Sequence, residues 1–121
     1  MASDASDVGF DDVKALADAL CKNATLTNLD LSNNGLTFKE GQVLAEALGK
    51  NTKLIYLNIS SNKLGYKGLE ILAHALRNNT TLIDLIIYEN QLSYEEYKTL
   101  GRVFYRNNAS IILGLDHSYD E

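Results

Sequence analysis

LTNLDLSNNGL at residues 26–36 decides the fold, because nearly the same sequence returns twice further along the chain. It reappears as LIYLNISSNKL at residues 54–64 and as LIDLIIYENQL at residues 82–92. The first residues of the copies, Leu26, Leu54 and Leu82, are equally spaced and define a 28-residue step. A fixed period of about 20 to 50 residues is typical of a chain built from stacked structural repeats. The sequence therefore predicts a repeat architecture.

Two apolar periodicities alternate within each copy, and together they predict the local structure. In LTNLDL and LIYLNI the last two apolar residues stand two apart, which is typical of a short strand with one buried face. In FKEGQVLAEAL and YKGLEILAHAL the apolar residues recur at intervals of three and four, as on one face of a helix. Each copy is therefore one strand plus one helix. Because such a unit cannot bury its apolar face alone, the copies must stack.

The helical half recurs four times in one phase. It reads LADAL at 16–20, LAEAL at 44–48, LAHAL at 72–76 and LGRVF at 100–104. The aromatic residues that open these segments keep the same step, as Phe10, Phe38, Tyr66 and Tyr94. We therefore expect an α/β solenoid of four helix–strand units, with parallel strands on one side and helices on the other.

One asparagine in each copy has a predicted structural role. Asn34, Asn62 and Asn90 stand just after the strand, where the chain must turn and its buried backbone groups need partners. An asparagine side chain supplies both a donor and an acceptor, so it can tie each turn to its neighbour. We expect these three residues to form a ladder along the solenoid and to bind no ligand.

The pattern LxxLxLxxNxL, followed by a helix that ends in AxAL and repeated at a 28-residue step, resembles the ribonuclease-inhibitor-like class of leucine-rich repeats. That class also occurs in NOD-like immune receptors, in GTPase-activating proteins for Ran and in tropomodulins. The resemblance covers about residues 6–115. It implies a right-handed α/β leucine-rich-repeat solenoid, shaped as a short horseshoe arc, with the parallel strands on its concave side and the helices on its convex side. The resemblance also implies that the concave face binds other proteins.

Length and charge set the domain organisation and exclude some partners. The 121 residues suffice for one domain, which we place at 6–116, between a disordered tail at 1–5 and an acidic tail at 117–121. Seven of the 16 acidic residues lie near the chain ends, and without them the formal charge would change from −5 to +2. No basic stripe is visible, so we expect no nucleic-acid partner.

Neither a membrane span nor a secretory signal is predicted. The sequence contains no apolar run of about 18 residues, and its first 12 residues, MASDASDVGFDD, carry acids and no basic residue. We therefore expect a cytoplasmic location. The single cysteine, Cys21, excludes an intramolecular disulfide framework and should be packed or half-exposed.

The last strand departs from the period. Aligning RNNASI at 106–111 with the earlier RNNTTL at 77–82 makes the step one residue longer, which places one extra residue near Tyr105 and Arg106. Ile111 would then supply the first apolar position of an irregular last strand at 112–116. Its concave positions would be Ile112, Gly114 and Asp116.

The candidate binding site is the concave face between the buried strand leucines. Its candidate residues are Asn28, Asp30, Tyr56, Asn58, Asp84, Ile86 and Tyr88, with Ser32 and Ser60 beside them. Tyr56, Ile86 and Tyr88 place aromatic and aliphatic surface where folding alone does not need it. Single exposed apolar residues are also common in proteins without a binding role, so both interpretations stay open.

No catalytic, metal or cofactor pattern is present in the sequence. His74 takes a helix position held by Asp18, Glu46 and Arg102 in the other copies, which predicts an exposed side chain. The consecutive residues Asp116, His117 and Ser118 cannot converge as a catalytic triad. There is no phosphate-binding glycine loop, no zinc-binding helix motif and no calcium loop. We expect no enzyme activity and no cofactor.

The favoured function is a non-catalytic module that binds another protein through the concave face. One alternative is a regulator of an enzyme or GTPase that acts by surface contact, although no arginine stands at a concave position. Another is a fragment of a larger receptor or of a bacterial host-directed effector. A homodimer through the open edges of the sheet is also possible by this reasoning.

Overall fold

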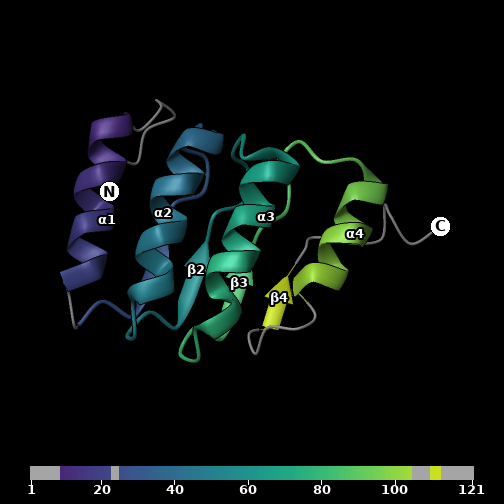
Figure 1. Ribbon diagram of the computed structural model, residues 1–121. Coiled ribbons are helices and arrows are strands. Elements are labelled where there is room, and N and C mark those ends of the chain that lie inside the picture. Colours follow the sequence, from purple (N-terminus) through teal and green to yellow (C-terminus); the bar gives the residue numbers. More distant parts are fainter. Residues whose placement is uncertain (1–8, 23–24, 105–109, 113–121) are drawn as a thin grey trace.

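The computed structural model describes residues 9–22 and 25–104 and the backbone of residues 110–112. The elements in chain order are α1 (Phe10–Lys22), β1 (Asn28–Asp30), α2 (Phe38–Lys50), β2 (Tyr56–Asn58), α3 (Gly65–Ala75), the 3-10 helix η1 (Leu76–Asn78), β3 (Asp84–Ile86), α4 (Tyr94–Phe104) and β4 (Ser110–Ile112) (Figure 1). Helices and strands alternate along the described chain, as the two apolar periodicities predicted.

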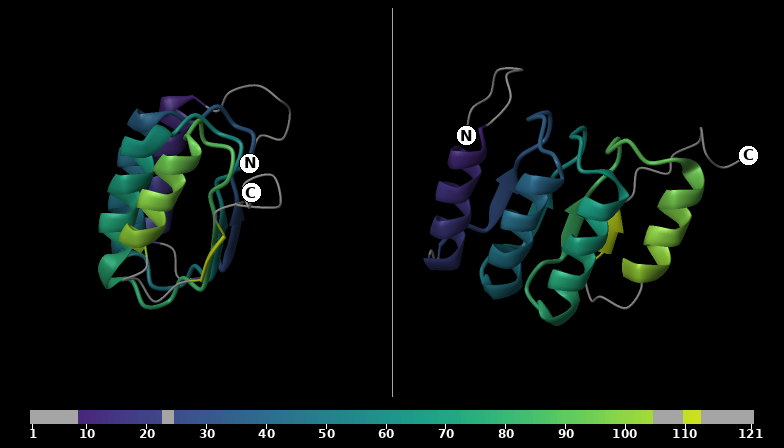
Figure 2. Two further views of the ribbon diagram at one scale, coloured as in Figure 1. Left: turned by 90° about the vertical axis from the view of Figure 1, so that its right-hand side faces the viewer. Right: turned by 45° about the horizontal axis from the view of Figure 1, so that its top comes forward.

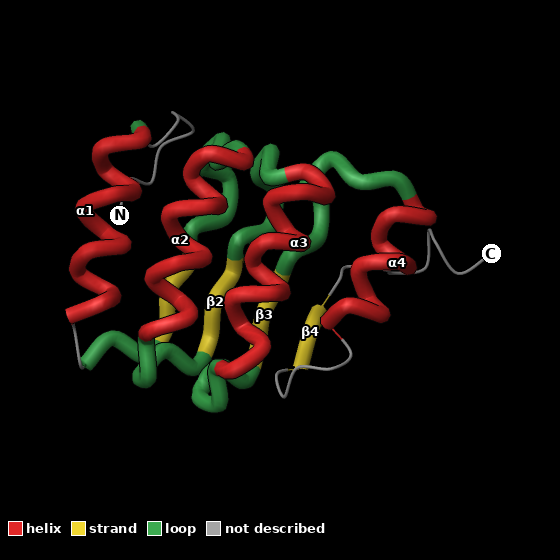
Figure 3. The backbone as a smooth tube through the Cα atoms, in the orientation of Figure 1, coloured by secondary structure: helices red, strands yellow, loops and turns green. Residues whose placement is uncertain are grey.

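The elements form two layers. The strands make one parallel sheet in the order β1-β2-β3-β4, and the helices stand side by side over one face of it (Figures 2 and 3). The register between the first three strands keeps the 28-residue step, since Leu29 pairs with Leu57 and Leu57 pairs with Leu85. The predicted α/β solenoid of four helix–strand units is confirmed.

The core lies between the helix layer and the sheet. The period assigns an inward position to one set of leucines, which lie in α2, α3, η1 and α4 and in or just before β2 and β3, and all of them are buried. They are Leu44, Leu48, Leu54, Leu57, Leu72, Leu76, Leu82, Leu85 and Leu100. Full burial of a leucine contributes about 1.5–3 kcal/mol. This continuous apolar layer therefore stabilises the stack.

Two helices begin at a hydrogen-bonded cap. At α4, Glu96 Oε1 accepts the Ser93 N–H at 2.9 Å and Ser93 Oγ accepts the Glu96 N–H at 3.1 Å. At α2, Glu40 Oε1 accepts both the N–H and the Oγ1–H of Thr37. Burial would raise the pKa of the Glu40 carboxyl, but the hydrogen bonds from Thr37, helped by the Glu40 backbone and the Lys39 charge, lower this pKa overall.

Asn62 joins the turns of two successive units. Its Oδ1 accepts the backbone N–H groups of Asn34 at 3.0 Å and of Leu36 at 2.9 Å. Its Nδ2 donates to the carbonyl oxygens of Leu31 and Ile59, both at 3.0 Å. One buried amide therefore satisfies backbone groups of its own unit and of the unit before it.

Asn90 repeats this arrangement one unit later. Its Oδ1 accepts the Leu64 N–H at 3.2 Å, and its Nδ2 donates to the carbonyl oxygens of Ile59 and Ile87 at 3.0 Å. Among the described residues, the side chain of Asn34 bonds only within its own unit, from Nδ2 to the carbonyl oxygens of Leu31 and Ser32. We call Asn34, Asn62 and Asn90 the turn asparagines.

A second row of buried asparagines lies at the other end of the strands, where each helix returns to the sheet. Asn51 Nδ2 donates to the Leu20 carbonyl oxygen at 2.8 Å, and Asn79 Nδ2 donates to the Leu48 carbonyl oxygen at 3.0 Å. Asn51 Oδ1 also accepts the N–H of Leu54 at 2.7 Å. These asparagines recur with the 28-residue period, yet the sequence analysis assigned them no role.

Tyr97 closes the row of turn asparagines after the third unit. Its hydroxyl oxygen accepts the Asn90 N–H at 3.0 Å and donates to the Ile87 carbonyl oxygen at 3.4 Å. A following asparagine would accept and donate at the same two groups. The buried tyrosine of α4 therefore replaces the next step of the row.

The predicted register of the last strand was wrong. Ser110 pairs with Asp84 and Ile111 pairs with Leu85, so this step is shorter than the period, whereas the sequence predicted a longer one. Buried Phe104 keeps the phase of Leu76, and only the connection that follows is shorter, by two residues. The predicted positions Gly114 and Asp116, and the tails at 1–5 and 117–121, lie outside the described residues.

No helix in the described part of the chain is long and apolar enough to cross a membrane.

Replacing Asn62 by alanine should lower the free energy of unfolding by about 2–4 kcal/mol, because buried backbone groups lose their partners at about 1–3 kcal/mol each. Urea unfolding followed by circular dichroism measures this change. Asn78 is exposed on η1, and Asn78→Ala should change the stability by less than about 0.5 kcal/mol. Equal effects of the two substitutions would contradict the bridging role.

Gln91 and Gly35 occupy the same repeat position with left-handed backbone, at φ 66° and 67°. A side chain costs about 1–2 kcal/mol in that conformation, partly offset by the greater unfolded-state freedom of glycine. Gln91→Gly should therefore raise stability by up to about 1 kcal/mol, and Gly35→Ala should lower it by about the same amount. Thermal unfolding of both variants checks this, and a lower Tm for Gln91→Gly would contradict it.

Candidate functional site

The face of the sheet turned away from the helices carries the predicted binding residues, and we call it the strand face. The candidate residues within the strands are Asn28 and Asp30 of β1, Tyr56 and Asn58 of β2, and Asp84 and Ile86 of β3. The register sets Tyr56 between Asn28 and Asp84, and Asn58 between Asp30 and Ile86. The structure therefore brings these six residues together in two adjoining rows.

In the first two units the strand face is occupied by local polar pairs. Asp30 Oδ1 accepts the Ser32 N–H at 2.9 Å and the Ser32 Oγ–H at 2.6 Å. Asn58 Oδ1 accepts the same two groups of Ser60, at 2.9 and 2.7 Å. The side-chain and backbone hydrogen bonds from Ser32 lower the pKa of the Asp30 carboxyl. These pairs stabilise the ends of the strands.

The third unit has no such pair and presents apolar surface instead. Ile86 and Tyr88 stand where Asn58 and Ser60 stand in the unit before. Ile86 is half-buried and Tyr88 is 37% exposed. Tyr56, on the neighbouring strand, is also half-buried. Tyrosine combines a large apolar ring with a hydroxyl, which makes it common at protein interfaces.

Two exposed isoleucines extend this apolar surface at the start of the strands, and the sequence analysis missed them. Ile55 is 41% exposed and Ile83 is 54% exposed. They lie side by side, because the Ile83 N–H donates to the Ile55 carbonyl oxygen at 2.8 Å. Neither isoleucine belongs to the buried apolar positions of its unit, and the equivalent position in the first unit is Thr27. The sequence could have revealed these two residues, because each is an apolar residue at a position that the core does not use.

Three residues with left-handed backbone lie at the opposite end of the strand face. Asn33, Ser61 and Glu89 have φ values of 60°, 56° and 55°. Ser61 Oγ donates to Glu89 Oε1 at 2.9 Å. The strand face therefore has an apolar rim at Ile55 and Ile83 and a polar rim at these turns.

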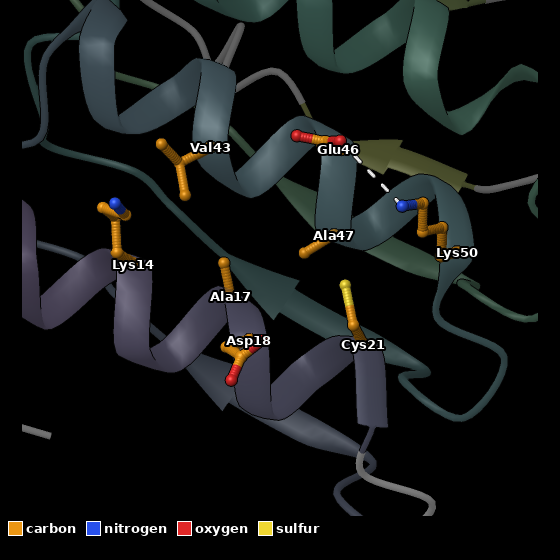
Figure 4. A pocket seen from close by; sticks show the side chains of 8 residues that line it. All are labelled: Lys14, Ala17, Asp18, Cys21, Val43, Glu46, Ala47 and Lys50. Atoms are coloured by element: carbon orange, nitrogen blue, oxygen red, sulfur yellow. Dashed lines mark ion pairs between the residues drawn. The ribbon is translucent and has the colours of Figure 1, made fainter.

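The helix side carries a shallow hollow of about 220 Å³ between α1 and α2. Figure 4 shows that its eight lining side chains come from both helices, with Cys21 directed towards α2. The charged lining residues are Lys14, Asp18, Glu46 and Lys50. Cys21 is exposed, so the expectation of a packed or half-exposed thiol was wrong. An open hollow lined by charges of both signs is typical of a hydrated surface rather than of a ligand-binding pocket.

No catalytic arrangement is visible in the part of the chain that the structure describes. His74 is exposed, as predicted, and its Nδ1 lies 3.1 Å from the Arg77 guanidinium. Across residues 9–22, 25–104 and 110–112, no group of three or more histidine, cysteine, aspartate or glutamate side chains could hold a metal ion.

Comparison with known proteins supports the repeat assignment. One leucine-rich-repeat family model matches residues 25–50, and a second leucine-rich-repeat family model matches residues 50–73. No curated protein sequence matches the chain.

A solved structure shares the fold. The structure titled leiomodin-1 actin-binding site 2 superposes with a TM-score of 0.79 at 19% sequence identity. The superposition covers 88% of this chain, which spans 63% of the length of that one. The repeats, the parallel sheet and this likeness define the fold as an α/β leucine-rich-repeat solenoid.

Asp30→Asn should weaken the pH dependence of stability below pH about 4. The folded-state pKa of Asp30 is lowered from its usual 3.8, so its contribution is present above that value and is lost as the pH falls through the folded-state pKa. The effect should be under about 1 kcal/mol because the carboxylate is exposed. Urea unfolding between pH 5 and about pH 2 measures it.

Asn58→Asp is the reciprocal variant, because Asn58 accepts the same pair of hydrogen bonds without a charge. It should add pH dependence of the same sign. A steeper dependence in Asp30→Asn than in the unaltered chain would contradict this assignment.

Proposed function

We propose that the protein is a non-catalytic module that binds another protein through the strand face and its apolar rim. One observation carries the proposal: apolar side chains gather over β2 and β3 at positions that the fold leaves exposed. Tyr88 is 37% exposed and Ile83 is 54% exposed. Exposed apolar patches bordered by polar residues mark interaction sites.

The size of the face determines how a partner must bind. Neighbouring strands lie about 4.8 Å apart, so four strands present a surface only about 14 Å wide. A standard interface buries about 800 Å² per partner. A partner must therefore contact the rims as well, at Ile55 and Ile83 on one side and at Ser61 and Glu89 on the other.

Several finer assignments accompany this proposal. The 28-residue step supports the ribonuclease-inhibitor-like class, and the free exposed thiol of Cys21 suits a reducing cytoplasm. Regulation of an enzyme or GTPase by surface contact would use the same face. A role as part of a larger receptor or host-directed effector, and a homodimer through the sheet edges, stay predictions from the sequence.

The likeness to a structure titled as an actin-binding site suggests actin as a first defined probe. Sedimentation of the protein with filamentous actin tests this possibility directly. Sedimentation with actin that requires the strand face would identify actin as a partner. Failure to sediment would contradict actin as the partner but not the proposed binding surface.

The strand face is tested by replacing Tyr56, Ile86 and Tyr88 together by serine. We expect capture of partner proteins by the immobilised chain to fall at least tenfold, because the aromatic and aliphatic anchors are lost. Stability should fall by only about 1–2 kcal/mol, since none of the three side chains is fully buried. Quantitative mass spectrometry of captured proteins and urea unfolding provide the two measurements.

A matched triple variant on the helix side serves as the control. Lys14, Glu46 and Lys50 are exposed, and their replacement by serine should leave capture unchanged. The assignment of the strand face would be contradicted if the strand-face variant still captured its partners. It would also be contradicted if both variants lost capture equally.

A further inference from the structure

The charges of the molecule are distributed unevenly between its two layers. The helices α1 to α4 and η1 together carry eight acidic and eight basic residues. The segments that form the strand face and its rims, residues 27–33, 55–61 and 83–89, carry three acidic residues and no basic one. The acidic residues are Asp30, Asp84 and Glu89. The strand face is therefore negative, whereas the helix layer is balanced.

The third unit combines this negative charge with the apolar surface. Its outward residues are Ile83, Asp84, Ile86, Tyr88 and Glu89, and the first unit has Thr27, Asn28, Asp30, Ser32 and Asn33 at the same positions. The set in the first unit is polar throughout. The fold therefore requires neither the apolar side chains of the third unit nor a carboxylate at positions 84 and 89.

Asp84 is the acidic residue that most needs a partner. It is half-buried, and among the described residues its carboxylate has no hydrogen bond and no ion pair. Asp30, by contrast, accepts two hydrogen bonds from Ser32. Strand pairing sets Asp84 beside Tyr56, whose ring face can contact a cation. A partly desolvated carboxylate without a partner is stabilised by a cation that arrives from outside.

Glu89 provides a second anionic position at the other end of the apolar surface. Its backbone is left-handed, with φ 55°, a conformation that asparagine adopts more readily than glutamate. Its Oε1 accepts the Ser61 Oγ–H at 2.9 Å. An extended chain spans about 13 Å from Asp84 to Tyr88, and Glu89 follows directly. The apolar surface of the third unit therefore lies between two carboxylates.

The chain's own basic residues do not neutralise these two carboxylates. The nearest in sequence to β2, Lys53 and Lys63, lie in the connections before and after that strand, and both are exposed. Every ion pair among the described residues lies within a single helix, in α1, α2 or α4. The cations that suit Asp84 and Glu89 must therefore come from a partner or from the solvent.

The chemistry of the face selects among cations. In the part of the chain that the structure describes, no group of acidic side chains could hold a metal ion, and like charge disfavours a nucleic acid. An arginine side chain binds a carboxylate through two hydrogen bonds and stacks on an aromatic ring. Asp84 and Tyr56 offer both groups side by side.

We propose that the partner of the strand face is a basic and apolar polypeptide segment. An arginine pairs with Asp84 beside Tyr56, apolar side chains cover Ile86 and Tyr88, and a second basic side chain lies at Glu89. This inference rests on the proposed function, because it specifies the partner of the same face.

A random peptide library tests the inference with a defined probe. Displayed peptides of about 12 residues, long enough to cross the face, are selected on the immobilised full chain. Strand-face binders are those that lose binding at least about tenfold when Tyr56, Ile86 and Tyr88 are all replaced by serine. We expect these binders to be enriched at least about threefold in arginine and lysine, beside aliphatic or aromatic residues.

Substitutions of Asp84 then locate the charge. Asp84→Asn should weaken the selected peptides at least about fivefold in fluorescence anisotropy, because the ion pair is lost. This variant should fold, since Asn28 holds the same position in the first unit. A new selection on Asp84→Lys should favour acidic peptides. Glu46→Lys is the matched control, because it makes the same charge change at an exposed position of α2 and should leave the selection unaltered.

The outcomes separate this inference from the proposed function. Strand-face binders without basic enrichment, or binders that tolerate Asp84→Asn, would overturn the basic partner and leave the proposed binding surface intact. A library that yields no strand-face binder would also overturn the inference, and capture of natural partners would still test the face. Equal loss of binding in Asp84→Asn and Glu46→Lys would show a general charge effect and would overturn it as well.

Discussion

The structure depends on one recurring interaction, a buried asparagine amide that bonds to backbone groups of two successive units. Strands of three residues offer few hydrogen bonds of their own, and each turn would otherwise bury polar groups without partners. Asn62 and Asn90 solve this problem with donor and acceptor atoms on the same side chain. The apolar layer supplies most of the stabilisation, and the amides set the register in which that layer can form.

The amides also give the solenoid a direction. The Oδ1 atoms of Asn62 and Asn90 face the unit before them, so the last unit needs a substitute for the next asparagine. In the first unit, the described residues include no donor to Asn34 Oδ1. Tyr97 provides the substitute with one hydroxyl that both accepts and donates. Asn34 has no such substitute among the described residues. This difference follows from the orientation of the amide and not from a difference in composition between the ends.

The proposed binding surface lies where the fold does not require particular side chains. Asp30 and Asn58 pair with serines two residues later and so serve the strand ends. In the third unit Ile86 and Tyr88 replace the polar pair. Ile55 and Ile83 add exposed apolar surface beside these two residues. Because none of these side chains is fully buried, a change at these positions alters the surface more than the stack. The fold likeness therefore does not by itself identify the partner.

The sequence by itself determined the period, the alternation of strand and helix, the inward leucines and the position of the turn asparagines, because every unit solves the same packing problem with the same residues. Only the tertiary structure decided the features that depend on neighbours. These are the register of β4, the closing role of Tyr97, the second asparagine row and the exposure of Ile55 and Ile83. The similarity of RNNASI to RNNTTL suggested a repeat step longer than 28 residues. The register is instead set by backbone pairing between β3 and β4, and the connection from Phe104 to β4 is shorter than in the earlier units. Periodicity predicts the features that all units share. The structure at the ends of the stack depends instead on which neighbouring segments each end unit packs against.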